Sequence, residues 1–186
     1  MQYDSNTNHK TNNEMKYRNI IGIDPDTNKS GVALLDVSTR ILEITTLTFP
    51  KVLKYIEWAN EMAIDNRQSL LVVVEAGWLN AKSNFHGQTG YVGQKVAKNV
   101  GANHQTGKHI IEWCEEIGVD VELQKPLVKG WKGRNGKITH EELAYFTGIT
   151  GRTSEEGRDA GLIAWNYAGL PIKVKSYGKE NRDNRL

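Results

Sequence analysis

Residues 18–36 read RNIIGIDPDTNKSGVALLD, and this stretch decides the fold. An apolar run ends in Asp24, a short polar turn follows, and a second apolar run ends in Asp36. Two apolar runs joined by a short polar turn are typical of a β-hairpin. Apolar and polar positions then alternate over residues 41–49, so the sequence predicts an antiparallel meander of three strands.

The remainder of the chain predicts helices that alternate with two further strands. The predicted segments are helices over 52–63, 139–146 and 154–168, strands over 70–74 and 119–123, and a glycine-rich stretch over 87–107 that opens into a helix ending near residue 117. This order predicts an α/β fold with a mixed five-stranded sheet, in which a three-strand antiparallel meander is joined by parallel strands, and with helices on both faces.

Length and composition favour one globular domain. The chain has 186 residues, of which 38% are hydrophobic and 25% charged. We expect a folded domain over 18–172, a disordered polar tail over 1–17 and a basic tail over 173–186. No apolar run approaches the length of a membrane span and a polar stretch follows Met1, so we expect a cytoplasmic protein. The lone Cys114 excludes an intramolecular disulfide and lies in a pattern typical of a packed helix.

Two acidic side chains are expected at the same edge of the sheet. The meander and a right-handed helical crossover make the first and fourth strands parallel, so Asp24 and Glu75 end at one edge, where open α/β sheets bind ligands. An Asp before a proline also suits a turn, which is a second interpretation of Asp24. Glu75 follows five apolar residues, and burying a carboxylate there is costly unless a cation meets it.

The last predicted helix adds Glu156 and Asp159, three residues apart and therefore on one helical face. Thr153 with Glu156 fits a capping box, which is a structural explanation for Glu156. Asp159 lies on the face expected to pack on the sheet, close to Asp24 and Glu75. Oxygen-only clusters select hard ions such as Mg²⁺ or Mn²⁺, and two such ions suit phosphodiester hydrolysis. The four acids therefore predict a metal site.

Positive charge is concentrated in blocks, although the net charge is only +2. Residues 76–111 contain no Asp or Glu, and residues 125–137 contain five cations and no acid. Aromatic side chains lie among these cations, which suits a polyanion with stacking bases. Solvated lysines that maintain solubility would give the same charge pattern. The candidate nucleic-acid contacts are Trp78, Lys82, Lys98, Lys125, Lys132 and Arg134, with Trp131 as a further stacking aromatic.

Taken in order, these segments resemble the RuvC-type Holliday junction resolvases, which are crossover junction endodeoxyribonucleases of the ribonuclease-H-like superfamily. The matching segments are IGIDPDTNKSGVALLD (21–36), LVVVEAGW (71–78), KPLVKGWKGRNGK (125–137) and EEGRDAGLIA (155–164). The resemblance implies a ribonuclease-H-like fold and a Mg²⁺-dependent endonuclease that cuts four-way DNA junctions as a homodimer, in DNA recombination and repair. The first motif alone also resembles actin-like ATPases and sugar kinases.

The resemblance also implies roles for single residues. Asp24, Glu75, Glu156 and Asp159 would hold two Mg²⁺ ions, with Mn²⁺ as a substitute, and Lys129 and Lys137 would bind or stabilise phosphate. The family has Asp or His at the position of Glu156, so Glu155 beside it is an alternative ligand. Trp78 has the spacing of an aromatic that wedges into the junction centre, and a buried core position is its alternative. Trp58, Trp113 and Trp165 lie in helical patterns and are expected in the core.

Other functions fit parts of this pattern. The same fold and metals would serve a nuclease that cuts flaps, other branched DNA or RNA–DNA duplexes. An actin-like nucleotide-binding protein normally needs two such domains, and the length of this chain argues against it. A protein that binds junctions without cutting them would have no need of the four acids.

Overall fold

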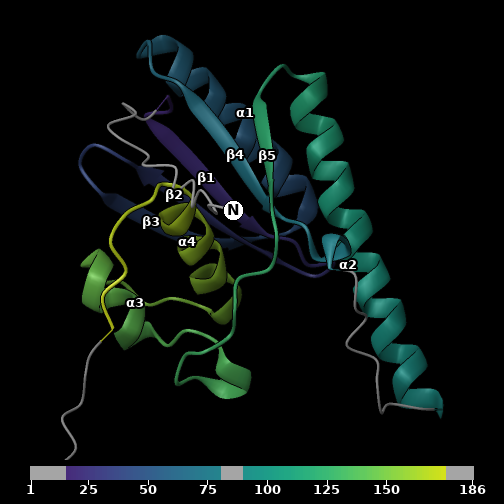
Figure 1. Cartoon of the computed structure of the whole chain (residues 1–186). Helices are drawn as coiled ribbons and strands as arrows, with labels where there is room; N and C mark the ends of the chain where they lie inside the picture. Colours follow the sequence, from purple (N-terminus) through teal and green to yellow (C-terminus); the bar gives the residue numbers. More distant parts are fainter. Residues whose placement is uncertain (1–15, 81–89, 175–186) are drawn as a thin grey trace, which may run out of the picture.

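The computed structural model describes residues 16–80 and 90–174 of the chain. A central sheet carries helices on its two faces (Figure 1). The elements are β1 (Asn19–Asp24), β2 (Ser30–Asp36), β3 (Ile41–Leu47), α1 (Phe49–Asp65), β4 (Leu70–Glu75), η1 (Gly77–Leu79), α2 (Gly90–Glu116), β5 (Asp120–Gln124), η2 (Arg134–Gly136), α3 (His140–Thr147) and α4 (Glu155–Tyr167). Most of both predicted tails, and Lys82, lie outside the described residues. Among the residues described, none of the helices is both long and apolar enough to cross a membrane.

The sheet has five strands in the order β3-β2-β1-β4-β5. Strands β1, β2 and β3 form an antiparallel meander, whereas β4 pairs parallel with both β1 and β5. The predicted mixed five-stranded sheet, an antiparallel meander joined by parallel strands, is therefore confirmed. Ile23 of β1 pairs with Val74 of β4, so the next residues along each strand, Asp24 and Glu75, end at the same edge.

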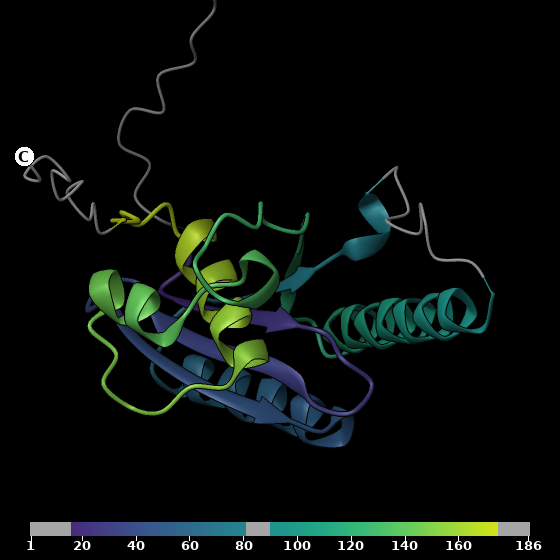
Figure 2. The ribbon, with the colours of Figure 1, turned by 90° about the horizontal axis from the view of Figure 1, so that it is seen from below.

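The two faces of the sheet bury separate cores, because successive side chains of a strand point to opposite faces. Figure 2 shows α1 and α4 on opposite sides of the sheet. The core beneath α1 and α2 includes Ile21, Ile23, Val72, Val74, Val52, Ile56, Ile110 and Cys114. The core beneath α4 includes Ile20, Leu71, Val73, Ile163, Ala164 and Trp165. Helices on both faces and a buried Cys114 are thus confirmed.

Two glycines allow α4 to lie directly on the sheet. A Cβ atom on Gly22 would collide with the carbonyl oxygen of Ala160 and lie 2.8 Å from the amide nitrogen of Ala164. A Cβ atom on Gly31 would collide with the carbonyl of Glu156. Glycine in a strand interior often marks such a close backbone approach. The position of α4 is therefore set by backbone contact with β1 and β2.

Helix α2 is longer than the sequence predicts. The glycine-rich stretch expected before it is helical from Gly90 onward. A helical glycine is unfavourable by about 1 kcal/mol relative to alanine, which is why the pattern favours a loop. At Gly107 the missing side chain makes room for the ring of Trp78, because a Cβ atom there would lie 2.9 Å from it and 3.1 Å from Pro25. Pro50 lies in the first turn of α1, a position that proline favours.

The predictions for the helical tryptophans have different outcomes. Trp165 is 2% exposed, so its core position is confirmed. Trp58 is 46% exposed and packs against the ring of Tyr55, so the core prediction is wrong for this residue. Trp113 is only partly buried. A helical apolar pattern identifies the inward stripe but not its edges, where a large ring covers core atoms and still contacts solvent.

Candidate functional site

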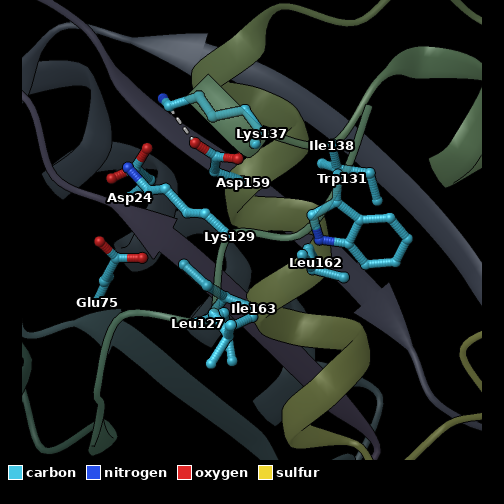
Figure 3. A pocket seen from close by; sticks show the side chains of 12 residues that line it. Asp24, Glu75, Leu127, Lys129, Trp131, Lys137, Ile138, Asp159, Leu162 and Ile163 are labelled. Atoms are coloured by element: carbon cyan, nitrogen blue, oxygen red, sulfur yellow. Dashed lines mark ion pairs between the residues drawn. The ribbon is translucent and has the colours of Figure 1, made fainter. Parts of the chain in front are cut away.

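Three carboxylates face one another where β1, β4 and α4 meet. Every second side chain of β1 and of β4 points to the α4 face, so Asp24 and Glu75 share the face on which α4 places Asp159. Together with Lys129 and Lys137 they line a cavity of about 120 Å³ (Figure 3). The predicted meeting of acids from two strands and the last helix is thus seen for these three residues.

Asp24, Glu75 and Asp159 are partly buried and repel one another. Burial, together with the charges of Glu75 and Asp159, raises the pKa of Asp24 to about 8, and Lys137 offsets only part of this. Burial and Asp159 also raise the pKa of Glu75 above its ordinary range, against the opposing effect of Lys129 and Lys137. Ionising both acids therefore costs free energy in this site, and a further cation would stabilise their charged forms.

Lys137 is the internal counter-ion of this site. Its Nζ lies 2.8 Å from Oδ2 of Asp159 and 3.0 Å from Oε1 of Glu155 (Figure 3 draws the Asp159 pair). Burial lowers the pKa of Lys137, but the two ion pairs outweigh it and raise the pKa above its ordinary value. Lys137 is therefore charged at neutral pH, and it binds the same carboxylate that a divalent cation would need.

The two neighbouring glutamates at the start of α4 have different positions. Glu155 contacts Lys137. Neither Glu155 nor Glu156 is among the residues that line the cavity. The predicted capping box of Thr153 and Glu156 is wrong, because the N-cap of α4 is Ser154, whose hydroxyl accepts a hydrogen bond from the amide of Gly157 at 3.0 Å. The choice between Glu155 and Glu156 as a fourth ligand stays a prediction.

The basic loop, residues 129–137, folds back on itself and so brings Lys129 and Lys137 close together. The amide of Trp131 donates to the carbonyl of Gly136, and that of Gly133 to the carbonyl of Lys137. Gly136 has a φ of +73°, and a Cβ atom there would lie 3.2 Å from the Cβ of Lys129. The tight turn, which glycine permits, places Lys129 and Lys137 on the wall of the same cavity.

Two residues that the sequence analysis missed hold this loop in place. Arg158, next to Asp159, donates from Nε to the carbonyl of Ile138 at 2.8 Å and from Nη1 to the carbonyl of Thr153 at 2.9 Å. The sequence feature that could have identified Arg158 is that it is the one cation of a helix rich in small and apolar residues. Arg158 thereby ties α4 to Ile138, the residue that follows Lys137.

Glu142 is the second missed residue. Its carboxylate accepts from the amide of Thr139 at 3.0 Å and from the amide of Lys132 at 3.1 and 3.2 Å. Thr139 returns the bond by accepting from the amide of Glu142, which completes a capping box at the start of α3. The signal was present as the T-x-x-E pattern of residues 139–142.

The candidate nucleic-acid contacts lie on several elements. Trp78, in η1, is half-buried against α2, with its ring 5.7 Å from that of His104 and 5.9 Å from Nζ of Lys108. It thus combines a packed face with partial exposure, and its role as a wedge stays a prediction. Lys98 on α2 is exposed, as are Lys125, Lys132 and Arg134 in and before the basic loop.

The donor set at the sheet edge suits a hard divalent cation by its chemistry, since Asp24, Glu75 and Asp159 offer only carboxylate oxygens at a site short of positive charge. Within residues 16–80 and 90–174, no three or more His, Cys, Asp or Glu side chains are gathered closely enough to hold a metal ion. Lys137 binds Asp159 in this arrangement. Metal binding would therefore require Asp159 to exchange Lys137 for the ion and the acids to draw together.

Comparison with known proteins identifies similar solved structures. No protein-family model and no curated protein matches the sequence. A Thermus thermophilus RuvC bound to a Holliday junction substrate is 18% identical, with a TM-score of 0.49, over 82% of this chain and 93% of that one. A second Thermus thermophilus RuvC structure is 19% identical, with a TM-score of 0.42, over 84% and 99%. A fowlpox virus resolvase bound to Holliday junction DNA is 12% identical, with a TM-score of 0.38, over 81% and 97%. These are proteins of the kind that the sequence motifs resemble.

Proposed function

We propose that this protein is a Mg²⁺-dependent, structure-selective DNA endonuclease that resolves four-way junctions by hydrolysing paired phosphodiester bonds. The observation that carries the proposal is the cavity in which three carboxylates, Asp24, Glu75 and Asp159, face two lysines of one basic loop. Phosphodiester hydrolysis needs positions for a polyanionic substrate and for its neutralising cations, and this cavity offers both. The motif resemblance supports branched DNA as the substrate, and RNA–DNA duplexes remain the alternative.

The three carboxylates would hold the divalent ions, Mg²⁺ or Mn²⁺, with Glu155 or Glu156 as a fourth ligand. When bound, such ions activate water and neutralise charge on the leaving oxygen. The acids favour cation binding, because an added positive charge stabilises the ionised form of Asp24, whose pKa is raised by burial and by the neighbouring acids.

The chain's own residues would position the substrate. Lys129 is exposed and lines the cavity, so its ammonium is free to meet a phosphate oxygen as the strand enters. Lys137 would turn from Asp159 toward the same phosphate while Glu155 remains its partner. The apolar wall formed by Leu127, Leu162 and Ile163 excludes water and strengthens each of these interactions.

Binding of the junction arms would use the exposed cations outside the cavity. Lys98, Lys125, Lys132 and Arg134, with Lys82, would contact backbone phosphates. Trp78 would stack at the junction centre. Symmetric cutting of two strands requires two sites, so we propose a homodimer, which would act in recombination and repair in the cytoplasm.

The test uses a labelled mobile four-way junction, a flap, an RNA–DNA hybrid and a linear duplex, each with Mg²⁺ or with EDTA. We expect paired, Mg²⁺-dependent cuts in the junction only. Asp24→Asn and Glu75→Gln should each reduce cutting by at least about 10³-fold, because each removes a charged oxygen ligand, and should retain junction binding. Asp65→Asn, on the exposed end of α1, is the matched control and should cut normally.

Three results would contradict parts of the proposal. Cutting of the flap or hybrid in place of the junction would refute the substrate and retain the metal site. Equal cutting in EDTA would refute the metal site. If no substrate is cut while the junction is bound, the protein is a binding module.

A further inference from the structure

A second cavity, of about 200 Å³, adjoins the catalytic one. Trp131 lines both cavities, so the two meet at this residue (Figure 3 shows it at the first cavity). The far side of the second cavity is formed by Tyr145 of α3 and by Lys173 near the end of the described chain. Nothing in the proposed reaction uses this space.

The walls of the second cavity suit a flat ring better than a phosphate. Two of its side chains, Trp131 and Tyr145, are aromatic, and bases stack on aromatic side chains whatever their sequence. In this cavity the positive charges of Lys132 and Lys173 are balanced by the negative charges of Glu141 and Glu142. The side chains that line the cavity therefore offer a phosphate no net positive charge.

The carboxylates of Glu141 and Glu142 have different hydrogen-bond partners. Glu142 is bound to the amides of Lys132 and Thr139 and so serves the fold. Glu141 is exposed at the start of α3, and hydrogen bonds from its own amide and from Thr139 lower its pKa, so it is an ionised acceptor. A carboxylate accepts hydrogen bonds from the exocyclic amino group of a base, as in the pairing of Glu or Asp with N4 of cytosine. Thymine has no such group.

We propose that this second cavity receives one unpaired nucleobase with an exocyclic amino group, adjacent to the phosphodiester held in the catalytic cavity, and thereby selects where the strand is cut. This inference rests on the proposed function. Trp131 provides the stacking surface and Glu141 the acceptor. Because Trp131 bounds both cavities, a base unstacked beside the bound phosphate lies within reach of the second cavity without movement of the sheet.

The first experiment compares cutting of junctions that differ only in the base next to the cut. We expect the protein to prefer cytosine to thymine there by roughly 5- to 100-fold. Glu141→Ala should bring this ratio close to one, and Trp131→Ala should lower cutting of every junction and broaden the cut positions. Glu61→Ala, an exposed residue of α1 with the same change in charge, is the control and should retain the preference. An unchanged ratio in Glu141→Ala would overturn the inference.

A second measurement separates failure of this inference from failure of the proposed function. The Asp24→Asn protein is mixed with a junction that carries 2-aminopurine, a fluorescent base with an exocyclic amino group, at the same position. Stacking on Trp131 should quench the fluorescence, and Asp24→Asn combined with Trp131→Ala should not. If the fluorescence is quenched but the wild-type protein cuts no DNA, the nuclease function is refuted and the base site is retained. If the wild-type protein cuts DNA but the fluorescence is not quenched, the base site is refuted and the nuclease function is retained. Circular dichroism of Trp131→Ala, with Trp131→Phe as a milder variant, excludes loss of fold as the cause.

Discussion

Replacing Gly22 by alanine tests whether backbone contact between β1 and α4 positions the site. The new Cβ would collide with the carbonyl of Ala160 and lie 2.8 Å from the amide nitrogen and 3.1 Å from the Cβ of Ala164. These are helix backbone and Cβ atoms, which no rotamer change can move. Ordinary contact begins at 3.4 Å, so α4 must retreat by roughly 0.6 Å or more. Overpacking of this kind costs about 1–3 kcal/mol of unfolding free energy.

The retreat of α4 would also move Asp159 relative to Asp24. A misplacement of about 1 Å reduces catalysis by about 10²-fold, so we expect a loss of roughly 10- to 100-fold in junction cutting by the Gly22→Ala protein. Urea unfolding monitored by circular dichroism gives the stability change, and single-turnover cutting at a temperature where the variant is folded gives the activity change.

The matched control is Gly101→Ala in α2. A Cβ atom on Gly101 meets nothing within 4 Å, so the only effect expected is the higher helix propensity of alanine, a gain of up to about 1 kcal/mol. Wild-type stability and activity in Gly22→Ala would refute the close contact. Equal destabilisation by Gly101→Ala would show that the loss has another cause.

Three further predictions concern the supports of the site and the charges. Arg158→Met should lower the free energy of unfolding by about 2 kcal/mol in urea titrations, because two backbone carbonyls lose a charged donor, whereas Arg152→Met on the exposed loop should change it little. Burial favours a higher pKa for Asp36, but hydrogen bonds outweigh it and lower the pKa to about 2, so this residue stabilises the fold above about pH 4 and the contribution is lost as the pH falls toward 2. Asp36→Asn should therefore have a free energy of unfolding about 1 kcal/mol below wild type near neutral pH, a small value because the ion pair of Asp36 with Arg18 is partly exposed. The stabilities of the two proteins should converge near about pH 2. A difference that stays constant with pH would contradict this. Lys137→Met frees Asp159 and should raise Mn²⁺ affinity by about 3- to 10-fold in calorimetry without DNA, and a weaker affinity would show that the ammonium does not compete.

Much of the site could be predicted because it depends on short-range rules. Asp24 and Glu75 each end an apolar run, and the parallel direction of their strands follows from the handedness of a helical crossover. Strand alternation then places both on one face, and helical spacing adds Asp159. None of these steps requires knowledge of how a loop folds.

The contacts of the basic loop could not be predicted, because they depend on distant partners. Lys137 reaches Asp159 and Glu155 only because the chain reverses at Gly136 and is anchored by Arg158. No local pattern encodes that combination.

The capping boxes show the limit of local patterns in a different way. Thr139 and Thr153 both begin a T-x-x-E pattern, and only the first forms the box. The hydroxyl of Thr153 instead lies 3.0 Å from Nδ1 of His140, a contact across the loop between α3 and α4. The local pattern is the same at Thr139 and Thr153, so tertiary contacts determine which of the two forms the capping box.

The carboxylate of Glu142 binds two backbone amides, and this has a consequence for how the region can evolve. Glu142 binds the amide that begins α3 and an amide in the middle of the basic loop, so the helix start and the loop share a single anchor. A change in loop length between Lys132 and Thr139 would pull on that anchor and unwind the first turn of α3. This scaffold should therefore accept side-chain exchanges in the loop more readily than insertions or deletions between Lys132 and Thr139.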